Sequence, residues 1–131
     1  MLGIDTNVLV RFLVRDDEAQ FAKARKLIKR EVAARRRVFV SLLVLLETEW
    51  VLRGRYGLPK NEIIAAISGL LDATDVQFED ESAIEEALFV WKDNTADFAD
   101  CLIGAQNRRL GCRVTATFDA KASKLPGFIT A

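Results

Sequence analysis

Four acidic residues, far apart in the chain, lack an obvious basic partner: Asp5, Glu47, Asp100 and Asp119. If folding gathers them, their like charges repel unless some are protonated or cations neutralise them. A set of carboxylate oxygens suits Mg²⁺ or Mn²⁺. Such an ion binds phosphate oxygens and activates water, so the residues predict hydrolysis of a phosphodiester with one or two metal ions.

Glu47 and Glu49 share a predicted helix but differ in their neighbours. Glu49 precedes Arg53 by four positions, the favourable orientation for a helical ion pair, and is predicted to form one at the surface. An ionised carboxylate is costly in apolar surroundings, so Glu47 is expected to be protonated, to reach solvent or to meet a cation. The residues three and four positions from Glu47 are all apolar, namely Leu43, Val44, Trp50 and Val51.

Asp97 and Asp100 are three residues apart at the start of another predicted helix, so they share a helix face. Asp97 is predicted to cap the helix. Asp100 lies one turn inside and is harder to explain as a cap. Asp5 and Asp119, taken singly, also have an ordinary explanation as cap or turn residues, but that explanation weakens when all the acids must be accounted for together.

The amino-acid composition limits the reaction mechanisms that the protein can use. The chain has no histidine, which excludes mechanisms that use an imidazole base, nucleophile or ligand. Nineteen basic and nineteen acidic residues cancel, so any attraction for a polyanion must come from local patches. One predicted helix is rich in cations, and it is interpreted either as a solvated face or as a contact for a polyanion or an acidic partner. Its basic residues are Lys23, Arg25, Lys26, Lys29 and Arg30.

The remaining composition favours a cytoplasmic protein. Cys101 and Cys112 are not spaced like zinc ligands and are too few for a disulfide scaffold, so both are predicted to be buried, free thiols. No apolar run approaches the ~18 residues of a membrane span. The amino terminus lacks the pattern of a secretory signal.

Strand and helix patterns alternate along all 131 residues. Strands are predicted near 2–4, 38–40, 76–78, 113–117 and 128–129, with helices or helical turns between them. This alternation predicts one α/β domain over 1–131, a parallel sheet of four to five strands flanked by helices on both faces. If the first strand is central, Asp5 lies at the carboxyl end of the sheet, where ligands bind, and Glu47, Asp100 and Asp119 can converge on the same crevice.

The motifs, taken in order, resemble those of PIN-domain ribonucleases, and within these the VapC toxins of type II toxin–antitoxin modules. The resemblance covers essentially the whole chain at the size of the family. It is carried by Asp5-Thr6-Asn7 after an apolar strand, Glu47 on an apolar helix, Ala96-Asp97-Phe98-Ala99-Asp100-Cys101-Leu102-Ile103, and Thr117-Phe118-Asp119 followed by Leu125-Pro126-Gly127.

This resemblance implies a PIN-like fold and an endoribonuclease that depends on Mg²⁺ or Mn²⁺ and cleaves single-stranded or structured cellular RNA. It implies a homodimer that arrests growth until a VapB-like antitoxin binds, with DNA contacted only through that antitoxin. By position, Asp5, Glu47, Asp100 and Asp119 match the acidic quartet, and Thr6, Asn7 and Thr117 match the small polar residues beside the metal. Asp97 competes for the third place; Asp100 is favoured because a small residue and an apolar pair follow it.

RNA must also be held near these acids. Basic residues at the rim are candidates for contacts to phosphates, although each also has an ordinary explanation as a surface charge. The candidates are Arg11, Arg15, Arg53, Arg55, Arg108, Arg109, Lys121 and Lys124.

Two other functions fit parts of the pattern. A catalytically idle PIN-like domain would keep the acids as caps or around a structural cation and would act by binding RNA or a protein partner. A phosphatase or response-regulator-like domain would use Asp5 as nucleophile or phosphoacceptor. The latter fits poorly because Asn7 stands where a second acid is expected and no lysine has an obvious role.

Overall fold

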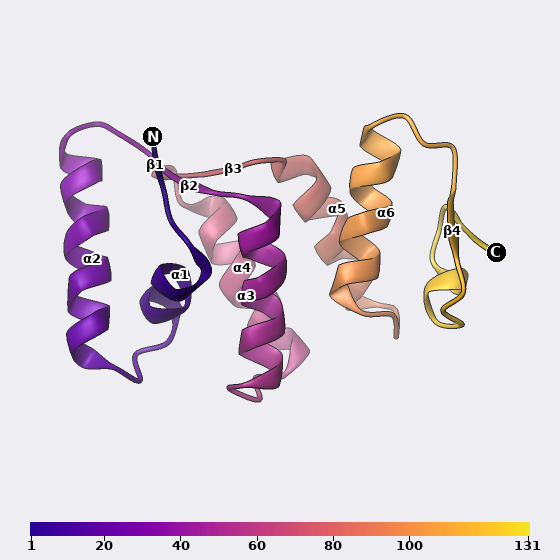
Figure 1. The fold of residues 1–131 in the computed structure, drawn as a ribbon, viewed down its shortest axis with the longest axis horizontal. Coiled ribbons are helices and arrows are strands. Elements are labelled where there is room, and N and C mark those ends of the chain that lie inside the picture. The colour runs from indigo at the N-terminus through magenta and orange to yellow at the C-terminus, as the bar shows by residue number, and fades with distance from the viewer. The chain divides into compact units, whose positions relative to one another are not determined.

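A computed structural model describes residues 1–131, which divide into two units, Met1–Glu79 and Asp80–Ala131. Figure 1 shows the elements in chain order, from indigo at the amino terminus to yellow at the carboxyl terminus. Each unit contains parallel strands and helices, so the predicted α/β class is confirmed.

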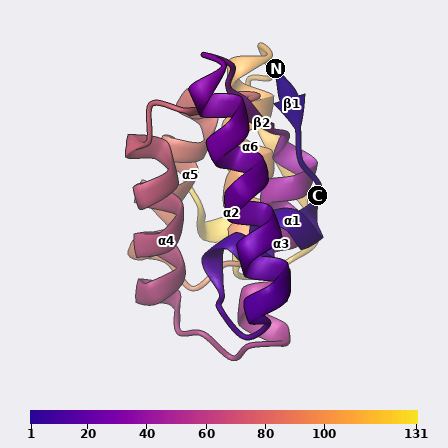
Figure 2. The same cartoon turned by 90° about the vertical axis from the view of Figure 1, so that its left-hand side faces the viewer.

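Unit 1 contains a parallel sheet of three strands, in the order β1-β2-β3. β2 is therefore the central strand of this sheet. β1 lies at its edge, so Asp5 follows an edge strand and not a central one. In both views α2, α3 and α4 run with their axes roughly aligned (Figures 1 and 2). The elements of unit 1 are β1 (Leu2–Gly3), α1 (Thr6–Leu13), α2 (Glu18–Ala33), β2 (Val38–Val40), α3 (Leu42–Gly54), α4 (Lys60–Asp72) and β3 (Val76–Phe78).

Local sequence explains where these helices begin. Asp17 caps α2 by accepting a hydrogen bond from the backbone N–H of Gln20, and the Ser41 hydroxyl caps α3 in the same way by accepting from Val44. Val38 and Val40 are buried, as expected for the central strand of a parallel sheet. The predicted helix and strand positions of unit 1 are thus found within a few residues.

Unit 2 contains two helices that pack together and a parallel pair of strands. The elements are α5 (Glu81–Lys92), α6 (Phe98–Arg109), β4 (Thr115–Thr117), a short 3₁₀ helix η1 (Ala122–Lys124) and β5 (Phe128–Thr130). Trp91 of α5 and Phe98 of α6 pack with ring centroids 5.1 Å apart. Gly111 follows α6 in the left-handed region, with φ 99°, the conformation in which a glycine commonly ends a helix.

The five strands are all parallel but pair as a sheet of three and a sheet of two, where one sheet of four to five strands was predicted. Both cysteines are free, and Cys101 is buried. Cys112 is exposed, so the prediction that it is buried is wrong; it lies in the turn after α6, where no element covers it. None of the helices is both long enough and apolar enough to cross a membrane.

Candidate functional site

Asp5 stands at the junction between β1 and α1. It has an extended backbone at the N-cap of α1, and its Oδ1 accepts a hydrogen bond of 3.0 Å from the backbone N–H of Val8. The predicted capping role is therefore real, but it uses only one carboxylate oxygen. The side chain is exposed, so its second oxygen remains available at the carboxyl end of β1.

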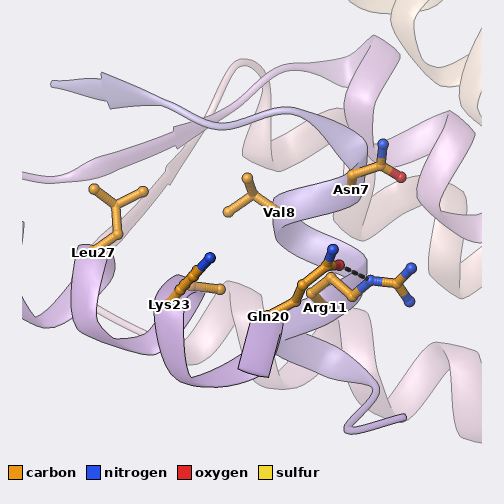
Figure 3. Close-up of a pocket in the computed structure, with 7 residues that line it drawn as sticks. Asn7, Val8, Arg11, Gln20, Lys23 and Leu27 are labelled. Carbon is orange, nitrogen blue, oxygen red and sulfur yellow. Dashed lines mark hydrogen bonds between the residues drawn. The ribbon is translucent and has the colours of Figure 1, made fainter. Parts of the chain in front are cut away.

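The two residues after Asp5 differ in exposure: Thr6 is buried and Asn7 is exposed. Asn7 lines a pocket of about 220 Å³ between α1 and α2 (Figure 3). Arg11 of α1 donates a hydrogen bond to Gln20 of α2 at this pocket, and Lys23 extends toward it from α2. A small pocket with a mainly apolar lining thus lies beside the Asp5 motif, with the polar ends of Asn7, Arg11 and Gln20 at its border.

Glu47 reaches solvent, which is one of the alternatives predicted for it, whereas Glu49 does not lie at the surface as predicted. Glu49 is only 1% exposed, and its Oε2 accepts a hydrogen bond of 2.9 Å from Nε of Arg53. The ion pair is confirmed, but the prediction that Glu49 lies at the surface is wrong. Glu47 is exposed and so reaches solvent, because its apolar neighbours Leu43 and Trp50 are themselves 78% and 64% exposed.

Asp97 and Asp100 form the amino-terminal turn of α6. Asp97 is at the N-cap position, but its side chain makes no capping hydrogen bond. The carboxylate of Asp100 instead accepts a hydrogen bond from the backbone N–H of Asp97, the contact made by the third residue of a capping box. Asp97 thus occupies the predicted cap position without the capping bond of its side chain, and its carboxylate is exposed. The choice of Asp100 as the third acidic ligand remains a prediction.

Asp119 follows β4 and leads into η1. Its Oδ1 accepts a hydrogen bond of 2.8 Å from the backbone N–H of Ala122, and its own N–H donates to the Thr117 hydroxyl at 3.0 Å. Thr117 therefore shapes the turn that presents the exposed Asp119. Phe118 between them is 92% exposed.

Asp97, Asp100 and Asp119 of unit 2 interact electrostatically. The pKa of Asp100 is raised, first by burial of its half-buried side chain and then by the negative charges of Asp119 and Asp97. No lysine or arginine forms an ion pair with any of the three. A cation would therefore find uncompensated negative charge here.

The donor chemistry of the predicted ligands fits a hard divalent ion, because all four are carboxylates. Asp5 and Glu47 belong to unit 1, where no hydrogen bond or ion pair links them, and Asp100 and Asp119 belong to unit 2. In neither unit are three histidine, cysteine, aspartate or glutamate side chains placed to hold a metal ion.

Most of the predicted rim cations are already in ion pairs. These pairs are Arg11 with Asp16, Arg15 with Glu18, Arg53 with Glu49, Arg108 with Glu86 and Arg109 with Asp80. Arg55 lies over the ring of Tyr56, and Lys121 and Lys124 are exposed. For the five paired arginines the explanation as ordinary surface charges is sufficient.

Comparison with known families identifies a match to the PIN domain over residues 3–127. No match to a curated protein was found. The matched range includes all four predicted metal ligands and most of both units. The chain therefore belongs to the PIN-domain family, which has a nuclease-type fold.

Proposed function

We propose that this protein is a metal-dependent endoribonuclease in which Asp5, Glu47, Asp100 and Asp119 hold one or two Mg²⁺ or Mn²⁺ ions. The observation that carries the proposal is the PIN-domain match, which spans every one of these acids. The uncompensated charge around Asp100 supports it, because burial and then the charges of Asp119 and Asp97 raise the pKa of this residue, and a cation would offset those charges. When bound, such an ion activates water and stabilises charge on the scissile phosphate.

The chain itself orients the carboxylates. Asp5, Asp100 and Asp119 each accept a hydrogen bond from a nearby backbone N–H, which restricts the rotation of the side chain. A fixed carboxylate loses less conformational entropy when it binds a ligand, so these bonds preorganise the donors. Thr117 contributes by holding the turn before Asp119, and Asn7 offers an exposed amide beside Asp5.

Cleavage of a labelled single-stranded RNA by the purified protein tests this function. Activity is expected with Mg²⁺ or Mn²⁺ and not with EDTA. Asp5→Asn and Asp100→Asn are each expected to lower the cleavage rate at least about 100-fold, since mutations even in the outer shell of metal sites cost 10–100-fold. Asparagine caps helices as well as aspartate does, so Asp5→Asn should keep the fold.

Asp17→Asn is the matched control. Asp17 caps α2 with the same kind of hydrogen bond as Asp5 makes in α1, yet it is not among the proposed ligands. Full activity of Asp17→Asn beside inactive Asp5→Asn would separate metal binding from capping. Equal cleavage by the wild type and both site variants would mean that another site or a contaminant cuts the RNA.

We further propose that the protein acts as a VapC-type toxin, a cytoplasmic homodimer that a VapB-like antitoxin inhibits. The support is the similarity of the ordered motifs to those of VapC toxins. Induced expression should arrest growth, and co-expression of a small protein encoded next to it should restore growth. Light scattering should give the mass of a dimer, and DNA should bind only when the antitoxin is present. Growth unaffected by the wild type would contradict the toxin role without contradicting the nuclease.

A further inference from the structure

Positive charge is concentrated in a short part of the chain. Residues 23–37 contain eight of the nineteen basic residues and only one of the nineteen acidic residues. This segment carries a formal charge of +7, and the rest of the chain carries −7, so the neutral total conceals a strong asymmetry. Asymmetry of this kind creates a local field that the net charge does not reveal.

Five of these cations lie on α2, and all five are exposed: Lys23, Arg25, Lys26, Lys29 and Arg30. We call them the α2 basic face. None of them forms an ion pair, unlike most of the arginines elsewhere in the chain. The helical period places Lys26 and Lys29 at the middle of the exposed face, opposite the buried Ala24.

The acids of α2 do not neutralise this face. Glu31 is buried on the opposite side and is held by Arg36, with 2.6 Å between Oε2 and Nε. Glu18, in the first turn, pairs with Arg15. The guanidinium of Arg15 also lies over the Phe21 ring, 4.1 Å from its centre, and so covers this aromatic side chain.

A groove of about 330 Å³ runs along this face. Arg25, Lys26 and Lys29 line it together with Phe21 and the Arg15–Glu18 pair. The cations succeed one another at about one helical turn, so a polymer with repeated negative charges can meet several of them at once.

We propose that the α2 basic face binds the phosphate backbone of single-stranded RNA and holds the substrate for cleavage. The inference rests on the proposed nuclease for the identity of the polyanion. An acidic protein is the less suitable partner, because lysine is depleted in protein interfaces and such interfaces need an apolar centre. Between its cations the face exposes mainly small apolar side chains such as Ala22 and Ala33. Its one aromatic side chain, Phe21, is half-buried beneath the guanidinium of Arg15.

Binding without cleavage provides the test. Fluorescence anisotropy of a labelled single-stranded RNA, in EDTA, measures Kd at salt concentrations between about 50 and 200 mM. Lys26→Gln/Lys29→Gln should raise Kd about tenfold at low salt and reduce the slope of log K against log salt by about 1.4, because each lost phosphate contact removes about 0.7. With Mg²⁺, the same variant should raise KM for a long RNA and leave kcat unchanged.

The matched control is Lys92→Gln/Arg113→Gln, which removes two exposed, unpaired cations from unit 2. It should bind RNA like the wild type. Equal Kd values for the two double variants, or no RNA binding by the wild type, would overturn the proposal. Displacement of the RNA by polyglutamate as readily as by unlabelled RNA would also overturn it, in favour of an acidic protein partner.

The two proposals can fail separately. If the α2 variant loses RNA binding but Asp5→Asn and Asp100→Asn still cleave, the result supports RNA binding by the α2 basic face and contradicts the proposed metal site. If Asp5→Asn and Asp100→Asn lose cleavage while the α2 variant binds RNA normally, the result supports the proposed nuclease and means that RNA binds to another surface.

Discussion

Asp100 is half-buried and borders two other aspartates, so it is costly for the chain to keep it ionised. Its pKa is raised above the ordinary value of 3.8 by burial and by the charges of Asp119 and Asp97. The folded chain therefore keeps this proton to a higher pH than the unfolded chain does. Stability falls as the pH rises from the ordinary to the raised pKa, and at neutral pH the full cost is present.

Asp100→Asn removes this cost and keeps an oxygen that accepts the N–H bond of Asp97. In EDTA at pH 7 the variant should melt at a higher temperature than the wild type, and this difference should vanish well below pH 3.8, where Asp100 is protonated in both states. Circular dichroism against temperature at several pH values measures it. Mg²⁺ should then raise the Tm of the wild type more than that of the variant. A variant that is less stable than the wild type at pH 7 would contradict this account.

Substitution of the two glutamates of α3 should affect different properties: Glu49 should matter for stability and Glu47 for RNA cleavage. Glu49→Ala removes a buried partner of Arg53 and should lower the free energy of unfolding by about 1–3 kcal/mol. Glu47→Ala changes an exposed side chain and should alter it by less than about 0.5 kcal/mol, while abolishing cleavage if Glu47 is a metal ligand. Urea denaturation and the RNA cleavage assay provide the two measurements. The opposite pattern would assign the functional role to Glu49.

Among the elements, α6 and β5 have the most demanding contact. A Cβ on Gly104 of α6 would overlap the ring of Phe128 in β5, with its Cζ only 2.9 Å away. Glycine at this helical position is thus explained by close packing, which offsets its low helix propensity. This contact joins the strand pair of unit 2 to the helix that carries Asp100.

Gly104→Ala should therefore displace the Phe128 ring and lower the free energy of unfolding by about 1–3 kcal/mol. Gly69→Ala in α4 is the control, because nothing lies within 4 Å of the place its added methyl group would take, and alanine favours a helix by roughly 0.5–1 kcal/mol. Chemical denaturation should show opposite signs for the two variants. Stabilisation by both would mean that the Phe128 ring moves aside without cost.

For the molecule as a whole, the family match over residues 3–127 covers most of both units, and a single domain remains our prediction. A segment as short as 80–131 buries too little apolar surface to be stable alone, since domains below about 60 residues are marginal. We expect the full chain to unfold in one calorimetric transition and the fragment 80–131 to be unfolded by circular dichroism. Two separated transitions would mean that the units fold independently.

Features that depend on neighbouring residues were predictable from the chain. Asp17 and Ser41 cap their helices, Gly111 follows one, and Asp5 and Asp119 end strands, because capping and turn geometry involve only a few successive residues. The alternation of apolar segments likewise predicted the α/β class, since it reports which segments can pack on a sheet.

Tertiary structure decided which side chains are buried and which charges meet. Residue types placed Glu49 at the surface, but the packing of α3 buries it and exposes Glu47, because the face that a helix buries depends on what packs against it. The repulsion among Asp97, Asp100 and Asp119 arises from residues up to 22 positions apart, and only folding sets such distances. The residue types specified the available chemistry, and the three-dimensional packing determined the environment of each charge.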